Sequence, residues 1–369
     1  MPPVSLSFPW AVSRKAMLVF VGAAIVAGLF GGLWLAGRRE RQRADLLARV
    51  VRGAELYRLG KLDEAIAVDR EAIEIKPDLA EAHKNLGIAL GVKGRPAEAV
   101  AEFRTAIRLR SDDADAHYNL SVALLAQGMH EEAIAACQMA IRLRPDFAAA
   151  HMNLGAVLKS QGKLDQAIAE FRKAIRFQPS LVTAHNKLGY ALSEQGKLEE
   201  AITECRAAIQ LQPDYADAYL NLGTIRGNQG KLEEAIAAWR EARRLRPDLA
   251  VITHMNIGAV LKTQRKRDEA IAEYREAIRL QPDYADAHFN LATALGDLGS
   301  PEDGITELRA AIQFQPDHAS AHYVLGLAMR DEGNLEEAIA EFHKARDLAQ
   351  RGSKLATQIE RSLAATGPE

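Results

Sequence analysis

Histidines in one slot of a repeating pattern are the first residues that could do chemistry, because histidine ligates zinc and transfers protons. They are His83, His117, His151, His185, His254, His288 and His322. Ligands of one zinc ion must each lie about 2 Å from it, whereas neighbouring packed helices lie about 8–10 Å apart. We therefore interpret these histidines as packing residues and expect neither a metal site nor a cofactor.

Two cysteines, Cys137 and Cys205, stand in the same register two periods apart. Stacked helices would separate their Cα atoms by roughly 20 Å, and a disulfide needs about 4.4–6.8 Å. Both are therefore expected to be small core residues. No nucleophile with a matching base and no pair of acids on one helix face stands out, so the sequence predicts a protein that is not an enzyme.

The strongest candidate for binding chemistry is a ladder of asparagines in one slot, interrupted once by a lysine. The ladder comprises Asn85, Asn119, Asn153, Lys187, Asn221, Asn256 and Asn290. Each amide offers two donors and an acceptor, so a row of them can hold the backbone of an extended peptide. The alternative interpretation is that these amides form hydrogen bonds from helix to helix.

Apolar and aromatic residues precede the ladder slot, or its equivalent in the last unit. They are Tyr118, Met152, Leu220, Met255, Phe289 and Tyr323. We expect them to add side-chain contacts to a bound partner. Packing between repeats is the competing explanation for the same residues.

The elements that must position these residues repeat every 34 residues, as the spacing of Pro145, Pro179 and Pro213 shows. Each period predicts two helices, exemplified by residues 148–161 and 164–177, whose apolar residues recur at helical spacing. Glycines predicted to end the first helices recur as well. They are Gly94, Gly128, Gly162, Gly196, Gly230, Gly299 and Gly333.

A pattern of small and large residues predicts that the two helices of each period cross closely. Small residues such as Gly87 and Gly223 recur in the first helix, and rings such as Phe103 and Trp239 recur in the second. The first unit departs from this pattern, because Asp69 stands where an aromatic residue is usual. In the seventh unit Arg265 replaces the terminating glycine, and one residue is inserted between Pro247 and Gly258.

Nine units over residues 46–350 resemble the tetratricopeptide repeat (TPR) family in period and in their small and large positions. The resemblance implies an all-α, right-handed superhelical solenoid whose concave face, lined by the ladder slot, binds peptides or partner proteins. The array is similar to the asparagine-laddered superhelix of O-GlcNAc transferase, without its catalytic domain. Residues 351–369 are expected to form a C-terminal capping helix and tail.

Residues 17–36 carry no charge, and a helix of that length spans about 30 Å, the thickness of a bilayer core. We therefore expect one transmembrane helix between a tail at 1–16 and a basic juxtamembrane linker at 37–45. A cleaved signal peptide is the alternative. The basic residues after the span favour a single-pass membrane protein with a cytoplasmic array.

Small residues recur every fourth position along the expected span, at Ala24, Gly28, Gly32 and Ala36. Such spacing lets two membrane helices approach closely, which suggests a homo-oligomer. The alternative is that Gly and Ala are simply common in such helices.

Charge and composition leave three hypotheses for function. The chain beyond residue 43 is mildly acidic, which argues against nucleic acid as a partner. We favour a membrane-anchored scaffold or adaptor that binds a partner segment in the concave groove. The alternatives are a non-catalytic docking subunit of a membrane enzyme or envelope-assembly complex, and a structural, self-associating oligomer.

Overall fold

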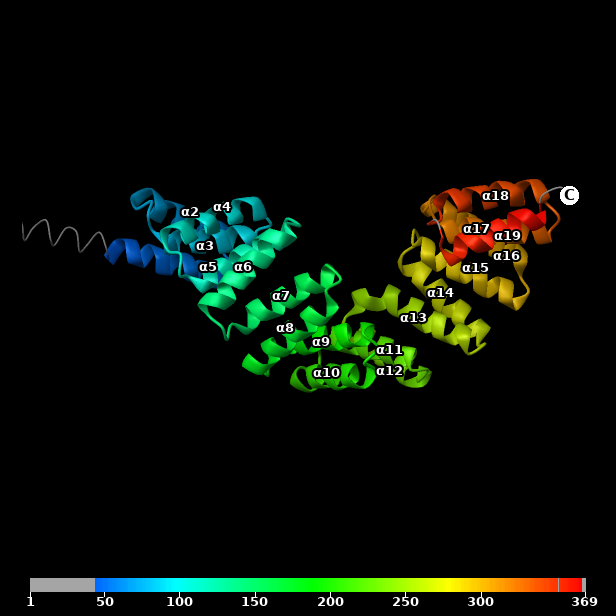
Figure 1. Ribbon diagram of the computed structural model, residues 1–369, viewed down its shortest axis with the longest axis horizontal. Coiled ribbons are helices and arrows are strands. Elements are labelled where there is room, and N and C mark those ends of the chain that lie inside the picture. Colours follow the sequence, from blue (N-terminus) through cyan, green and yellow to red (C-terminus); the bar gives the residue numbers. More distant parts are fainter. Residues whose placement is uncertain (1–43, 351, 367–369) are drawn as a thin grey trace, which may run out of the picture. The chain divides into compact units, whose positions relative to one another are not determined.

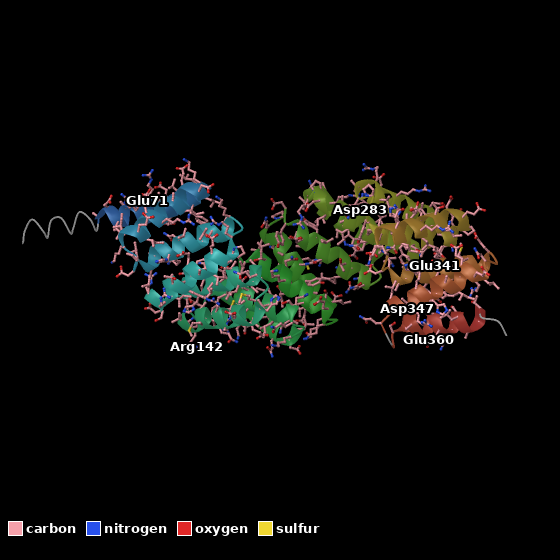
Figure 2. All side chains as sticks on the ribbon, turned by 90° about the horizontal axis from the view of Figure 1, so that it is seen from above. Glu71, Arg142, Asp283, Glu341, Asp347 and Glu360 are labelled. Carbon is pink, nitrogen blue, oxygen red and sulfur yellow. The ribbon has the colours of Figure 1, made fainter. Side chains whose placement is uncertain are left out.

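The computed structural model describes residues 44–350 and 352–366, and all regular secondary structure in these residues is helical. The prediction of an all-α chain is therefore confirmed. The described chain divides into two compact units, and the division falls between Val157 and Leu158 in the sequence of helix α7. Figure 2 shows side chains projecting from both units, among them Glu71 and Arg142 in the first and Asp283 in the second.

The first unit begins with a helical stretch at residues 44–58. It continues through α2 (Leu62–Ile75), α3 (Ala80–Val92), α4 (Pro96–Leu109), α5 (Ala114–Ala126), α6 (His130–Leu143) and most of α7 (Ala148–Ser160). Helices α3 and α4 pack against each other as a hairpin, as do α5 and α6, and α4 also packs on α5 (Figure 1). Each hairpin is one period of the sequence.

The second unit continues the series of hairpins. It contains α8 (Leu164–Phe177), α9 (Val182–Glu194), α10 (Leu198–Leu211), α11 (Ala216–Asn228), α12 (Leu232–Leu245), α13 (Ala250–Thr263), α14 (Arg267–Leu280), α15 (Ala285–Leu298), α16 (Pro301–Phe314), α17 (Ala319–Asp331), α18 (Leu335–Leu348) and α19 (Lys354–Thr366). From α9 to α18 each odd-numbered helix pairs with the next (Figure 1). The one-residue insertion falls beside the 3-10 helix η1 (Pro247–Leu249), which precedes α13.

Small residues allow the two helices of a hairpin to cross closely. A Cβ atom built on Gly258 would lie 2.7 Å from the Tyr274 ring, and one built on Gly326 would lie 2.7 Å from the Phe342 ring. Both rings are almost completely buried. Since real Cβ atoms do not approach other atoms this closely, a larger residue in the first helix would push the ring out of its site.

The predicted glycine terminators adopt the left-handed conformation that glycine tolerates best. Gly94 has φ 77° and Gly299 has φ 90°, and the other five predicted glycines are also positive. Arg265, which replaces glycine in the seventh unit, takes the same conformation with φ 60° and is the one non-glycine residue with positive φ in the described chain. The backbone conformation is thus kept although its usual residue is lost.

The last helix, α19, lies against α17 and α18. Ile359 is completely buried there, and Leu355 and Leu363 pack against the same cluster as Phe342. These residues recur every fourth position, so one face of α19 covers the apolar surface of the last hairpin.

The predicted localisation requires a correction. No helix in residues 44–350 and 352–366 is long and apolar enough to cross a bilayer. Repeat helices of 13 or 14 residues, such as α17 and α18, extend only about 20 Å, whereas a bilayer core is about 30 Å thick. This finding contradicts the prediction of a single-pass membrane protein with a cytoplasmic array.

Several predictions about the N-terminus lie outside the described residues. They concern the tail at 1–16, the span at 17–36 and the start of the basic linker at 37–45. The small residues Ala24, Gly28, Gly32 and Ala36, on which the expected homo-oligomer depends, lie there as well.

Candidate functional site

The ladder residues all lie on the first helices of their hairpins. Asn85 lies on α3, Asn119 on α5, Asn153 on α7, Lys187 on α9, Asn221 on α11, Asn256 on α13 and Asn290 on α15. The asparagines are half-buried, and Lys187 is exposed. An extended partner would therefore meet the edges of these amides rather than whole side chains.

Three of the ladder amides form hydrogen bonds within the array. Asn85 Nδ2 donates to the carbonyl oxygen of Val50 over 3.4 Å, and Asn221 Nδ2 donates to Asn186 Oδ1 over 2.8 Å. Asn153 forms a hydrogen bond with the side chain of Tyr118. These three contacts match the helix-to-helix interpretation of the ladder.

The other three ladder amides are available. The side chains of Asn119, Asn256 and Asn290 have no hydrogen-bond partner among the residues that the structure describes. Residue type does not distinguish these three asparagines from the three that form hydrogen bonds, because the neighbouring helix determines whether a partner is present. The uniform ladder of asparagines in the sequence is thus two sets in the fold, one with and one without hydrogen-bond partners.

The predicted flanking residues are mostly packed into the array. The ring of Tyr118 lies 4.9 Å from that of Phe147, and the ring of Phe289 lies 4.9 Å from that of His318. Met255 is buried within the core. Met152, Leu220 and Tyr323 are half-buried, and Leu220 and Tyr323 pack against core clusters. Their contribution to partner binding stays a prediction.

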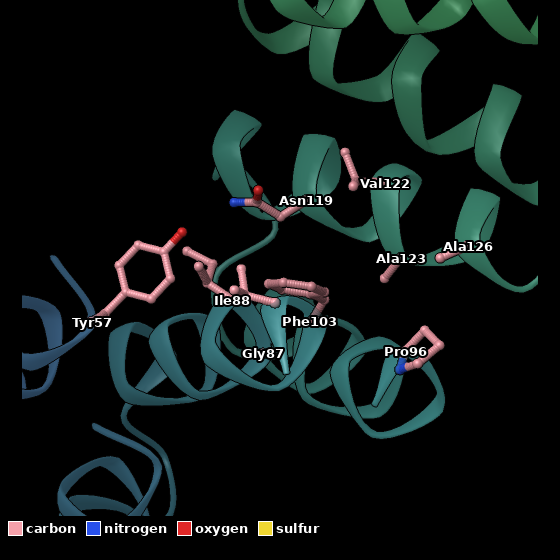
Figure 3. Close-up of a pocket in the computed structure, with 11 residues that line it drawn as sticks. Tyr57, Gly87, Ile88, Pro96, Phe103, Asn119, Val122, Ala123 and Ala126 are labelled. Carbon is pink, nitrogen blue, oxygen red and sulfur yellow. The ribbon is translucent and has the colours of Figure 1, made fainter. Parts of the chain in front are cut away.

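An open pocket of about 240 Å³ lies beside Asn119 in the first unit. Figure 3 shows Asn119 and Val122 on one side of it, and Ile88, Phe103 and Pro96 on the other. Val122 is 43% exposed although it is apolar. The sequence signal that could have revealed the pocket is Gly91, which also lines it and leaves room where several other repeats carry a side chain, such as Leu125 and Lys159.

The repeated histidines are held by polar contacts rather than by simple packing. His185 Nδ1 lies 2.6 Å from Glu204 Oε2, and Nε2 lies 2.9 Å from the carbonyl oxygen of Pro179. A carboxylate and a carbonyl can only accept, so an imidazolium that donates from both nitrogens satisfies the geometry. The hydrogen bond to Glu204 raises the pKa of His185.

The same histidine–glutamate contact recurs in other hairpins, always over 19 residues of sequence. The further pairs are His83–Glu102, His254–Glu273, His288–Glu307 and His322–Glu341, each at 2.5 Å. Each joins the first helix of a hairpin to its second helix. These contacts therefore link the two helices of a hairpin, which the sequence alone did not reveal.

Neither cysteine is suited to nucleophilic chemistry. Cys137 and Cys205 are both buried and free. Burial raises the pKa of both thiols, that of Cys205 to about 12. A thiol in this state is protonated at neutral pH and is a poor nucleophile.

Family models match the chain from its first described hairpin to its last. Models of the tetratricopeptide repeat match residues 84–146, 290–353 and 216–249. A model described as a TPR repeat matches residues 53–94, 157–196, 189–230 and 266–299. Residues 147–156 and 250–265, which hold most of α7 and all of α13, fall between these segments. No curated protein matches the sequence.

Solved structures with a similar fold include a tetratricopeptide repeat protein from Parabacteroides merdae, with 17% identity and a TM-score of 0.55 over 69% of this chain and 98% of that one. The Cut9–Hcn1 hetero-tetramer of APC/C has 18% identity and a TM-score of 0.56 over 76% and 55%. The pilF protein of Pseudomonas aeruginosa has 24% identity and a TM-score of 0.50 over 55% and 92%. Such identities concern the fold alone, and the resemblance to O-GlcNAc transferase stays a prediction.

Proposed function

Since the chain belongs to the tetratricopeptide repeat family, we propose that it is an interaction scaffold that binds an extended segment of a partner protein along its first helices. Proteins of this family are generally non-catalytic scaffolds for other proteins. The observation that carries the proposal is the free amide of Asn119 at the edge of an apolar pocket.

The two features suit different parts of an extended segment. A backbone peptide group needs both a donor and an acceptor, which one asparagine amide supplies. An apolar side chain of the segment gains about 1.5–3 kcal/mol when it is fully buried, and the pocket over Phe103 offers such a site. The combination resembles the way extended peptides are recognised elsewhere, with main-chain hydrogen bonds for affinity and pockets for specificity.

The second unit offers the same polar chemistry. Asn256 on α13 and Asn290 on α15 are half-buried and have no hydrogen-bond partner among the described residues. The amide of Asn221, between Lys187 and Asn256 in the ladder, is occupied by Asn186. We therefore assign partner binding to Asn119, Asn256 and Asn290, and a structural role to Asn85, Asn153 and Asn221.

The experiment first selects peptides that bind the full chain from a random peptide library. It then measures the affinity of these peptides for the wild type and for two triple variants. The first variant combines Asn119→Ala, Asn256→Ala and Asn290→Ala and so removes the free amides. We expect each substitution in it to weaken peptide binding about five-fold. The matched control, Asn85→Ala, Asn153→Ala and Asn221→Ala, removes engaged amides. It should lower thermal stability while the peptide affinity of the folded fraction holds.

Two results would contradict the proposal. If the full chain enriches no peptide, binding of an extended segment is wrong. If peptides bind equally to the wild type and to the variant without free amides, whose helical content is checked by circular dichroism, the binding surface is not the ladder. Arg172 and Arg309 are exposed on second helices. If reversing their charges then abolishes peptide binding, the result would favour the hypothesis of a docking subunit.

A further inference from the structure

A second apolar pocket, of about 360 Å³, lies in the hairpin of α15 and α16 and beneath α17. It stands in the same register as the pocket beside Asn119, six repeats further along the chain. Gly296 corresponds to Gly91, and Pro301 corresponds to Pro96. We call it the α16 pocket, lined by Ala292, Gly296, Gly304, Leu308, Val324 and Leu327.

The α16 pocket is open because Leu308 is smaller than its counterpart in a related hairpin. In the α11–α12 hairpin Gly227 occupies the slot of Gly296, but a Cβ atom on Gly227 would lie 3.3 Å from the Trp239 ring. That ring fills the space. In α16 the slot of Trp239 is taken by Leu308, and no atom lies within 4 Å of a Cβ atom built on Gly296.

The α16 pocket differs from the first pocket in its ladder position. Val324 lines it where Asn119 lines the first pocket. This wall therefore offers no amide to a peptide backbone. An occupant must be held mainly by its apolar side chain and by whatever charges surround the opening.

The charges at the α16 pocket are predominantly negative. Asp331 and Glu332 line it at the end of α17, and Glu302 and Asp303 are exposed at the start of α16, directly after Pro301. Asp331 pairs with Arg330 over 2.9 Å. The other three carboxylates have no ionic partner among the described residues.

The charges near the first pocket are neutralised within the array. Lys93 pairs with Asp63, and Arg95 pairs with Glu98 over 2.5 Å. The two pockets thus share an apolar floor and differ in the electrostatic potential at their openings. Opposite charges across an interface determine which partner binds and how fast it associates.

We propose that the α16 pocket binds an apolar side chain of a partner segment that carries Lys or Arg beside that side chain. The inference rests on the proposed function, because it assumes that extended segments of other proteins bind the array. The apolar side chain enters the space over Leu308, and the neighbouring basic group pairs with Glu302, Asp303 or Glu332.

The test uses the full chain and a fluorescein-labelled peptide with one leucine between two arginines in a Gly–Ser background. Fluorescence anisotropy gives its affinity, and the comparison peptide carries glutamates in place of the arginines. A Cβ atom built on Gly296 meets nothing within 4 Å, so Gly296→Leu places a side chain into the α16 pocket, and we expect at least about ten-fold weaker binding of the arginine peptide. Ala272→Leu adds the same side chain at an exposed position of α14 and serves as the control.

The carboxylates are tested by Glu302→Gln, Asp303→Asn and Glu332→Gln together. This variant should bind the arginine peptide several-fold more weakly, and its affinity should depend less on salt, since exposed charges are screened by salt. Asp112→Asn with Asp146→Asn removes exposed carboxylates from the first unit and should change neither quantity.

A second filling variant guards against a folding defect in the first. Ala292→Gly with Leu308→Trp copies the Gly223–Trp239 pair of the α11–α12 hairpin and should also abolish binding. Equal affinity for the arginine and glutamate peptides, or unchanged binding after both fillings, would overturn the inference. If the random library enriches peptides that depend on the free asparagines but lack an apolar–basic pair, this inference fails while the proposed function stands.

Discussion

The first and last hairpins each bury a carboxyl group, and they hold it in opposite ways. Asp69 on α2 is 1% exposed, and neither of its carboxyl oxygens has a hydrogen-bond partner. Glu341 on α18 is 7% exposed, but His322 Nδ1 lies 2.5 Å and Lys344 Nζ 2.7 Å from its oxygens. Burial is similar in the two hairpins, so the partners make the difference.

The pKa values of the two carboxyl groups shift in opposite directions. Burial raises the pKa of Asp69 to about 7. Burial also favours a raised pKa for Glu341, but hydrogen bonds from His322 and Lys344 outweigh it and lower that pKa below its ordinary value. Of these two buried acids, the one without a partner has a raised pKa and the paired one a lowered pKa.

Asp69 lacks a hydrogen-bond partner because of its position in the repeat. Asp69 occupies the position that Phe342 holds in the last hairpin, under Gly53 as Phe342 lies under Gly326. A ring in this slot needs no polar partner, and none is provided for the aspartate. Asp69 is thus a local conflict between residue and environment, whereas Glu341 belongs to the repeated histidine–glutamate contact.

The largest effect should come from removing the partner of Glu341. His322→Leu leaves a buried carboxylate with only Lys344, and we expect the free energy of unfolding of the last hairpin to fall by about 3 kcal/mol at pH 7. Hydrogen exchange of α17 and α18 measures this locally. The double variant with Glu341→Leu should lose much less; equal losses would show that the histidine acts by packing alone.

A smaller effect of opposite sign is expected in the first hairpin. Asp69→Leu removes an unpaired buried polar group and should raise the free energy of unfolding by about 1–3 kcal/mol at pH 8. Urea denaturation and hydrogen exchange of α2 provide the measurement. Asp69→Asn keeps an unpaired polar group without the charge and should gain less. A loss of stability in Asp69→Leu would mean that the carboxyl group has a stabilising partner.

The dependence of stability on pH should separate the two acids by sign. The folded pKa of Asp69, about 7, exceeds its unfolded value of about 3.9. The folded state then binds more protons, so stability from this site falls as pH rises from about 4 to 7. Glu341 has a lowered folded pKa, so its contribution is present above about pH 4.3 and is lost on acidification.

Matched variants isolate these two contributions. The stability gained by Asp69→Leu over the wild type should grow between about pH 4 and 7 and then level off. The stability lost by Glu341→Gln should shrink as pH falls below about 4.3. Parallel pH profiles for the two variants would contradict the contrast between the isolated and the paired acid.

The periodic features of the fold could be predicted from the sequence. Each of these features is a local requirement of the hairpin, so the sequence reveals it. They are the spaced prolines, the glycine terminators and the alternating small and large positions. Even the irregular Asp69 was visible, because it breaks a pattern that Phe342 and Tyr274 keep. What such a pattern cannot reveal is the environment that neighbouring helices create.

The candidate site shows this limit. Asn119 and Asn221 have the same residue type and slot, yet only Asn221 meets a neighbour, Asn186, that accepts its hydrogen bond. The pockets depend on pairs of positions on different helices, such as Gly296 with Leu308. The histidine–glutamate contacts likewise join two helices over 19 residues, as in His83–Glu102. None of these follows from a single periodic position.

Helix α19 covers the apolar face of the α17–α18 hairpin. In a stack of similar hairpins, each hairpin exposes an apolar surface on which a further hairpin can pack. Such head-to-tail contacts continue until an element covers that surface. Ile359 of α19 is fully buried on the last hairpin, so α19 occupies the place of a further repeat while breaking the pattern. In polymer terms it is a terminator, since without it the apolar face of the α17–α18 hairpin would be open to another hairpin.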